Sequence, residues 1–157
     1  MSDIWKIFMK DRSDKKAKES FVLHLAKSGY DNIQIVKEPS DIVAYKNGIK
    51  YYFEIKKTSA EKEYFGAATL TEWRSAYANP HNYFFVICQE RNDFFSFTIY
   101  TPEEFEKFST IPPFKIFFNI TLNGTDKVLT IRKNKSAIQL TKDTLTKMDA
   151  LFTTLKK

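Results

Sequence analysis

The chain has 157 residues, a length that predicts one domain with a sizeable core. Its net charge of +6 favours an anionic partner, with nucleic acid as the first candidate. The single cysteine, Cys88, excludes an intramolecular disulfide, and the lack of a signal region or long apolar stretch predicts a cytoplasmic protein that does not enter a membrane.

Helices and strands alternate along the first hundred residues. Apolar residues that recur every three or four positions predict the helices, and short apolar or alternating runs predict the strands. The expected elements are a helix over 14–28, a strand over 33–37, hairpin strands over 41–46 and 49–57, a helix from Thr69 or Thr71 to about Ala78, and strands over 83–90 and 94–100.

The rest of the chain is predicted to be a β-rich extension over about 105–157 within the same domain. Thr101 and Pro102 open a short helix, and Pro112-Pro113 is the one candidate sub-boundary. The predicted fold class is α/β, with a mixed central sheet flanked by helices. The further expected elements are strands over 114–122, 127–132 and 136–140 and a final helix over 141–155.

Two acids around a turn signal are the most informative feature of this sequence. Asn47-Gly48 is a strong signal for a two-residue hairpin turn. If these residues form the turn, Asp41 lies directly opposite Glu54 on the neighbouring strand. Lys56 is two residues beyond Glu54 and therefore projects from the same face of the sheet.

A facing pair of carboxylates needs a physical reason. Like charges directly opposite each other destabilise a sheet, so such a pair is expected where a cation sits between them. Two acids and a lysine at this spacing can build a site for a divalent metal ion. Ordinary solvated charges on a half-exposed strand face are the alternative interpretation of Asp41, Glu54 and Lys56.

The element order, with an acid opening the second strand and Glu-x-Lys on the third, resembles the PD-(D/E)XK nuclease superfamily. More narrowly, residues 54–73 look like the nuclease-like domain at the C-terminus of the plant NO VEIN protein. The likeness covers about residues 14–100 and implies a restriction-endonuclease-like αβββαβ core. The residues that support it are Pro39, Asp41, Glu54 and Lys56, with Glu19 in the first helix.

By this resemblance, Asp41, Glu54 and the backbone carbonyl of Ile55 would bind Mg²⁺, for which Mn²⁺ is expected to substitute. The metal would polarise the scissile phosphate, and Lys56 would orient or help deprotonate the attacking water. Glu19 is expected as a further ligand, and a surface position on the first helix is its alternative. The implied activity is endonucleolytic hydrolysis of DNA, in a restriction, defence or mobile-element setting.

Two other functions stay open at this point. One is a nuclease-fold subunit that binds DNA or protein without cutting, and the other is a nuclease of the same fold that cuts RNA. A homodimer is also considered, because cutting both strands of a duplex usually needs two sites.

Basic residues are candidates for holding nucleic acid, because contacts to phosphates position the backbone without reading its sequence. Solvated faces that only aid solubility are the alternative. The aromatic residues Tyr64, Phe65 and Trp73 are interpreted as core rather than as surfaces that stack on bases. The candidate basic residues are Lys15, Lys16, Lys18, Arg74, Arg132, Lys133 and Lys135.

Overall fold

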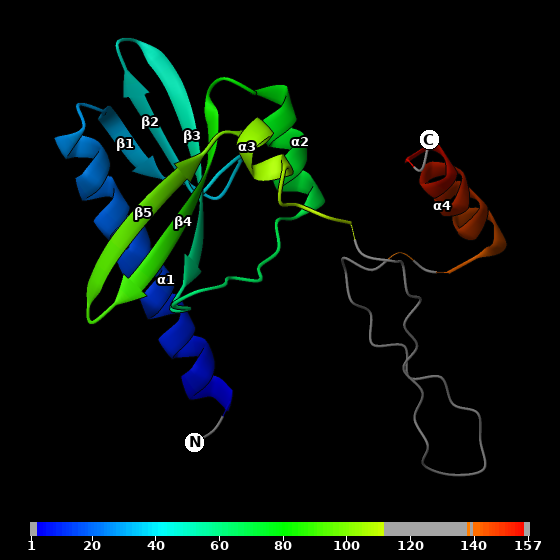
Figure 1. Ribbon diagram of the computed structural model, residues 1–157, viewed down its shortest axis with the longest axis horizontal. Helices are drawn as coiled ribbons and strands as arrows, with labels where there is room; N and C mark the ends of the chain where they lie inside the picture. The colour runs from blue at the N-terminus through cyan, green and yellow to red at the C-terminus, as the bar shows by residue number, and fades with distance from the viewer. Residues whose placement is uncertain (1–2, 112–137, 139, 156–157) are drawn as a thin grey trace. The chain divides into compact units, whose positions relative to one another are not determined.

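The computed structural model describes residues 3–111, 138 and 140–155 of the chain (Figure 1). The chain divides into two compact units, Met1–Ile111 and Pro112–Lys157, and their boundary falls at Pro112-Pro113. The first unit contains the sheet and the predicted site.

The second unit contains α4 (Lys142–Leu155), close to the helix predicted over 141–155. At its start, the Thr144 N–H donates a hydrogen bond of 3.1 Å to the side-chain oxygen of Thr141. No helix in the part of the chain that the structure describes is both long and apolar enough to cross a bilayer. The strands predicted over 114–122 and 127–132, and most of the one over 136–140, lie outside the described residues.

Residues 3–111 form one mixed sheet of five strands with the order β1-β2-β3-β4-β5. Strands β3 and β4 are parallel, and the other neighbours are antiparallel. The predicted α/β class with a mixed sheet and flanking helices is confirmed. The elements are α1 (Asp3–Lys27), β1 (Asp31–Ile35), β2 (Ile42–Lys46), β3 (Ile49–Thr58), α2 (Leu70–Ala78), β4 (Tyr83–Arg91), β5 (Phe94–Tyr100) and α3 (Pro102–Glu106).

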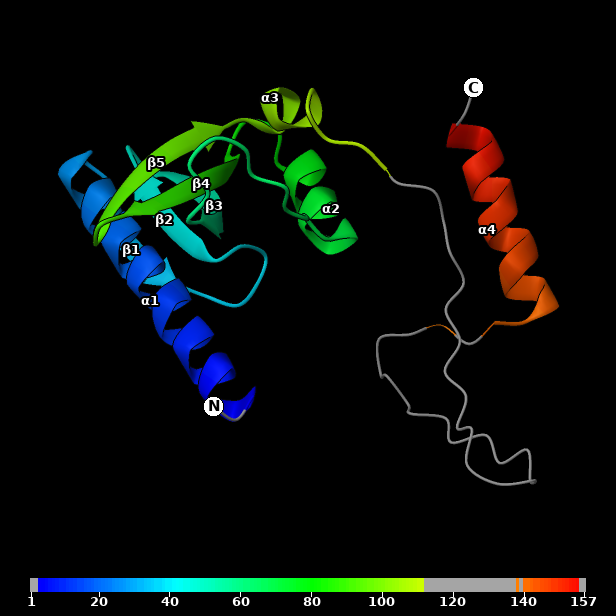
Figure 2. The same cartoon turned by 60° about the horizontal axis from the view of Figure 1, so that its bottom comes forward.

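Helix α1 covers one face of the sheet, and α2 and α3 cover the other (Figure 2). The α1 side chains that face the sheet are Ala17, Phe21 and Leu25, all of which are buried, as the helical periodicity predicts. Residues of β3 alternate between the two faces, so Phe53 and Ile55 pack under α1. The opposite face is aromatic and contains Tyr52, Trp73, Tyr83, Phe85 and Phe105.

Two elements begin earlier than the sequence pattern predicts. Helix α1 starts at Asp3 rather than near residue 14, and no glycine or proline interrupts the chain before Ser28. It ends where Gly29 takes a φ of +84°, a left-handed conformation that glycine adopts without strain. Strand β1 starts at Asp31 rather than 33, through an irregular register between Asp31 and Gln34.

The β2–β3 hairpin has the register that its turn signal predicts. Asn47 and Gly48 have φ values of +52° and +76°, which match the two positive φ angles of a type I′ turn. The predicted hairpin is therefore confirmed up to the start of β2. The ladder runs from the pair Lys46–Ile49 to the pair Ile42–Phe53.

We expect Gly48→Ala to destabilise the protein by about 1–2 kcal/mol, because a Cβ strains the left-handed backbone. No atom lies within 4 Å of the position that this Cβ would take, so the cost comes from the backbone alone. Asn47→Gly is the matched control and should cost little, since glycine also accepts a positive φ. Urea unfolding measures both, and equal stability of Gly48→Ala and wild type would contradict the expectation.

Candidate active site

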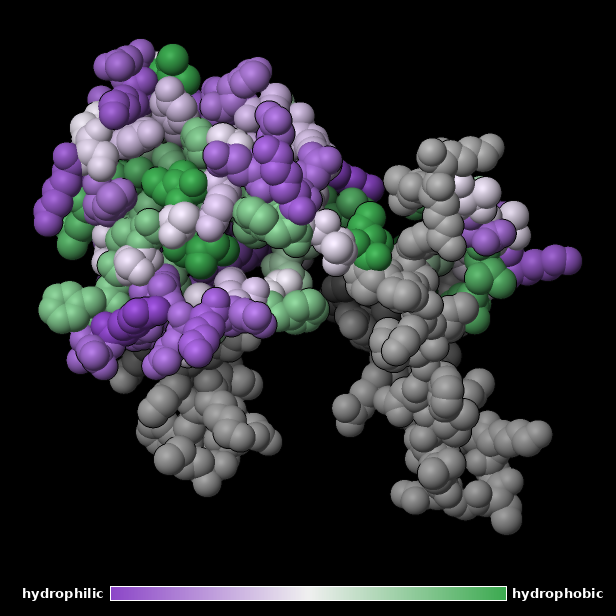
Figure 3. All heavy atoms as spheres, viewed as in Figure 1, coloured by the Kyte–Doolittle hydropathy of each residue, from purple (hydrophilic) through white to green (hydrophobic). Residues whose placement is uncertain are grey.

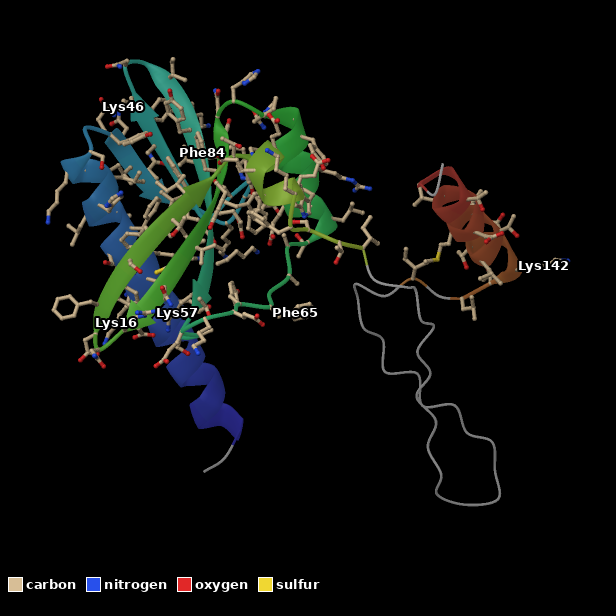
Figure 4. All side chains as sticks on the ribbon, viewed as in Figure 1. Lys16, Lys46, Lys57, Phe65, Phe84 and Lys142 are labelled. Atoms are coloured by element: carbon tan, nitrogen blue, oxygen red, sulfur yellow. The ribbon has the colours of Figure 1, made fainter. Side chains whose placement is uncertain are left out.

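A charged pocket of about 260 Å³ lies beside α1, where β2 begins. In Figure 4, Lys57 lies at the end of β3 next to α1, and Figure 3 shows hydrophilic side chains gathered at the same end of the sheet. Helix α1, strand β3 and the loop after β3 contribute to the walls. The lining residues are Asp14, Ala17, Lys18, Asp41, Ile55, Lys56, Lys57 and Tyr64.

Asp41 is held at the point where the β2–β3 ladder ends. Its Oδ2 accepts a hydrogen bond of 3.0 Å from the Ile55 N–H, so its side chain continues the pairing with β3. Its Oδ1 lies 2.5 Å from the Lys18 ammonium group of α1. The residue before it is also anchored, because the buried Ser40 hydroxyl donates to the Ile42 carbonyl at 2.9 Å.

Glu54 and Lys56 project from the face of β3 that α2 covers. The Lys56 ammonium nitrogen lies 3.3 Å from Glu54 Oε1 and 2.6 Å from Glu72 Oε2, an acid in the first turn of α2. Glu54 is only 8% exposed. The site is therefore a largely buried cluster in which Lys56 lies between two carboxylates.

Burial and the neighbouring charges change the pKa values of Glu54, Lys56 and Tyr83. Burial, together with the charges of Asp41 and Glu72, raises the pKa of Glu54 to about 7, although Lys56 lowers it. Burial alone would lower the pKa of Lys56, but its contacts with Glu72 and Glu54 outweigh burial and raise that pKa. Burial and the same three carboxylates also raise the pKa of Tyr83. Asp41 is thus close enough to Glu54 for its charge to disfavour the charged form of Glu54.

The structure brings Asp41, Glu54, Ile55 and Lys56 together as expected, but it does not bring Glu19 to them. Glu19 is exposed and pairs with Lys15 at 3.7 Å on the same helix. The expectation that Glu19 is a ligand is wrong in its geometry, because residues two apart on a helix point about 200° away from each other. Glu19 is two positions from both Ala17 and Phe21, which face the sheet.

Other α1 residues line the pocket instead. Asp14 and Lys18 are four positions apart, so both project on one side of the helix. Lys18 was expected among the basic residues that hold nucleic acid, and the structure places it against Asp41. A helical-wheel comparison with the apolar stripe would have identified this side of α1.

The remaining predicted positions do not line the pocket or lie outside the described residues. Lys16 and Arg74 are exposed, and Arg132, Lys133 and Lys135 lie outside the described residues. Of the three aromatic residues that the sequence analysis interpreted as core, only Trp73 packs against the core. The interpretation as core is wrong for the other two, since Phe65 is fully exposed on the loop after β3 (Figure 4) and Tyr64 is 41% exposed.

The carboxylates at this site are the candidate ligands for a divalent cation. Within the described residues, no group of three or more His, Cys, Asp or Glu side chains is arranged to hold a metal ion. Asp41 and Glu54 are two neighbouring carboxylates, and the hydrogen bond from the Ile55 N–H to Asp41 Oδ2 places the Ile55 backbone beside Asp41. Carboxylate oxygens are ligands that Mg²⁺ prefers, and in this structure Lys18 pairs with Asp41 and Lys56 pairs with Glu54.

No protein-family model matches this chain, and neither does any curated protein or solved structure.

Proposed function

We propose that this protein is a Mg²⁺-dependent endonuclease of restriction-endonuclease-like fold that hydrolyses phosphodiester bonds in DNA. The element order α1-β1-β2-β3-α2-β4 supports the fold, because it is the αβββαβ order that the sequence resemblance implies. The main support for the activity is the pairing of Asp41 with the buried Glu54 beside Lys56.

The like charges at this site are the reason to propose a cation. Burial and the neighbouring acids raise the pKa of Glu54 even with Lys56 beside it, so its carboxylate would be stabilised by a further counter-charge. Asp41, Glu54 and the Ile55 carbonyl would hold Mg²⁺, an ion that prefers oxygen ligands. When bound, Mg²⁺ supplies Lewis-acid stabilisation of charge on a phosphate.

The ammonium groups supply the rest of the chemistry. Lys56 presents a cation held by two acids, in a position to donate to a phosphate oxygen or to orient a water molecule. Lys18 stands on the other side of Asp41 and can contact the substrate backbone. Both groups line the same open pocket, where a phosphate could approach the acids.

Plasmid cleavage with Mg²⁺ and with EDTA tests the proposal. We expect cutting only with Mg²⁺ or Mn²⁺, and a loss of at least about 100-fold in Asp41→Asn, Glu54→Gln and Lys56→Met, since each removes a charge that acts on the transition state. These replacements are close in size to the native side chains, and the cleavage rates are compared at equal concentrations of folded protein because the charge changes also alter stability.

Glu19→Gln is the matched control, because it removes an acid from α1 that the structure places away from the pocket. It should cut at the wild-type rate. Full activity in the three site variants would refute the site, whereas DNA binding without any cutting would favour a non-cutting DNA-binding subunit. Preferential cutting of single-stranded RNA in a parallel assay would replace DNA as the substrate.

A further inference from the structure

We propose that Glu72 is a positioning residue of this site, which holds the Lys56 ammonium group and at the same time closes the first turn of α2. The inference rests on the proposed nuclease function and extends the site to a helix that the sequence resemblance did not assign to it. The observation behind it is that one carboxylate oxygen, Glu72 Oε2, contacts both Lys56 and Thr69.

Glu72 Oε2 makes two contacts. It accepts a hydrogen bond of 2.9 Å from the Thr69 N–H, and it lies 2.6 Å from the Lys56 ammonium nitrogen. In return, the Glu72 N–H donates to the Thr69 hydroxyl at 3.2 Å, which completes a capping box. The first turn of α2 and the Lys56 side chain are thus fixed by the same atom.

Helix α3 shows what a capping box looks like without this second contact. Thr101 and Glu104 form the same pair of hydrogen bonds, at 2.8 and 3.2 Å, but Glu104 is exposed to solvent. The Glu72 side chain is only 20% exposed, and it contacts the ammonium group of Lys56, whose side chain is 14% exposed. Capping alone does not require that burial, so Glu72 has a further role.

The distances indicate which acid holds Lys56. Its contact with Glu72 is 2.6 Å, whereas its contact with Glu54 is 3.3 Å. A lysine has four side-chain torsions, and one carboxylate leaves much of that freedom. Two carboxylates from different elements place the nitrogen between β3 and α2, and a displacement of about 1 Å in a catalytic group can cost about 100-fold in rate.

The first test compares cleavage by Glu72→Ala with two controls that remove only a cap. Thr69→Ala removes the hydroxyl partner in the α2 capping box, and Glu104→Ala removes the α3 box far from Lys56 in the chain. We expect Glu72→Ala to lower kcat about 10–100-fold with little change in KM. Both controls should stay within about threefold, although each loses cap stability.

Glu72→Gln adds a conservative variant, because its amide oxygen can still accept from Thr69 and Lys56. It should retain more activity than Glu72→Ala. If Glu72→Ala cuts as fast as Thr69→Ala at equal stability, Glu72 is only a helix cap and the proposal is overturned.

A second measurement does not depend on cleavage. The ¹⁵N-labelled Lys56 ammonium group should give a slowly exchanging NMR signal in wild type and in Glu104→Ala, and the signal should broaden or vanish in Glu72→Ala. An unchanged signal in Glu72→Ala would refute the positioning role. If wild type cuts no nucleic acid, the proposed function fails, and this signal still decides whether Glu72 holds Lys56.

Discussion

We expect Glu54→Gln to be more stable than wild type by about 3 kcal/mol near pH 8.5 and by only about 1 kcal/mol near pH 5, without divalent cations. The reason is the raised pKa of Glu54, about 7 in the folded protein against 4.5 as the ordinary value. Glutamine keeps the hydrogen-bond acceptor for Lys56 and removes the buried negative charge.

The direction follows from proton binding. Between the ordinary pKa of 4.5 and the folded pKa of about 7, the folded protein binds more protons at Glu54 than the unfolded chain. Stability therefore falls as the pH rises through this window, and the loss is complete above it. Glu54→Gln has no carboxyl group at this position and should lack this part of the pH dependence.

Urea unfolding at the two pH values and constant ionic strength measures the difference. The control is Glu19→Gln, in which an exposed carboxyl group is neutralised and stability should change by less than about 0.5 kcal/mol. A Glu54→Gln profile parallel to that of wild type would show that Glu54 is not the titrating group.

Mg²⁺ should restore the stability that is lost when Glu54 ionises, and it should do so only in wild type. A cation that binds only the folded state stabilises it by about 2.7 kcal/mol at a concentration 100 times its Kd. We therefore expect Mg²⁺ to raise the stability of wild type at alkaline pH and to leave Glu54→Gln nearly unchanged. The same shift in both proteins would place the cation elsewhere.

The second large effect is expected for Lys56→Met, which should destabilise the protein by about 3 kcal/mol near pH 8. Methionine fills a similar volume but leaves Glu54 and Glu72 without the ammonium group between them. Removing one partner of a buried ion pair is costly because the other charge stays buried. Near pH 5 the cost should be smaller, since Glu54 is then mostly protonated in the folded protein.

A double-mutant cycle separates this effect from lost packing. Adding Glu54→Gln to Lys56→Met should recover at least about 1 kcal/mol, because the two residues are in contact and their effects do not add. Lys16→Met, at an exposed position of α1, should change stability by less than about 0.5 kcal/mol. Equal losses in Lys16→Met and Lys56→Met, measured by urea unfolding, would contradict the buried pair.

Local signals in the sequence were sufficient to predict the part of the site that lies on β3 and at the start of β2. The Asn47-Gly48 turn sets the hairpin register, and alternation along β3 places Glu54 and Lys56 on one face. Both signals act over a few residues, so no knowledge of the rest of the fold is needed. The ladder stops one residue short of Asp41, and the side chain of Asp41 takes over the pairing with Ile55.

The residues that α1 and α2 contribute to the site could not be predicted in the same way. Glu72 is far from Lys56 in sequence, and its contact depends on how α2 packs over β3 and β4. Its capping box with Thr69 is visible as a sequence pattern, but that pattern gives no sign of a lysine partner. On α1, the side of the helix that faces the pocket depends on which stripe is buried, which favours Lys18 over Glu19.

The sequence by itself determined the α/β class, the β2–β3 register and the proximity of Glu54 to Lys56, because these follow from short-range periodicity and turn geometry. Only the tertiary structure decided which helical side chains complete the cluster. Packing of α1 and α2 against opposite faces of the sheet brings Lys18 to Asp41 and Glu72 to Lys56, and such contacts depend on helix position and rotation over the core.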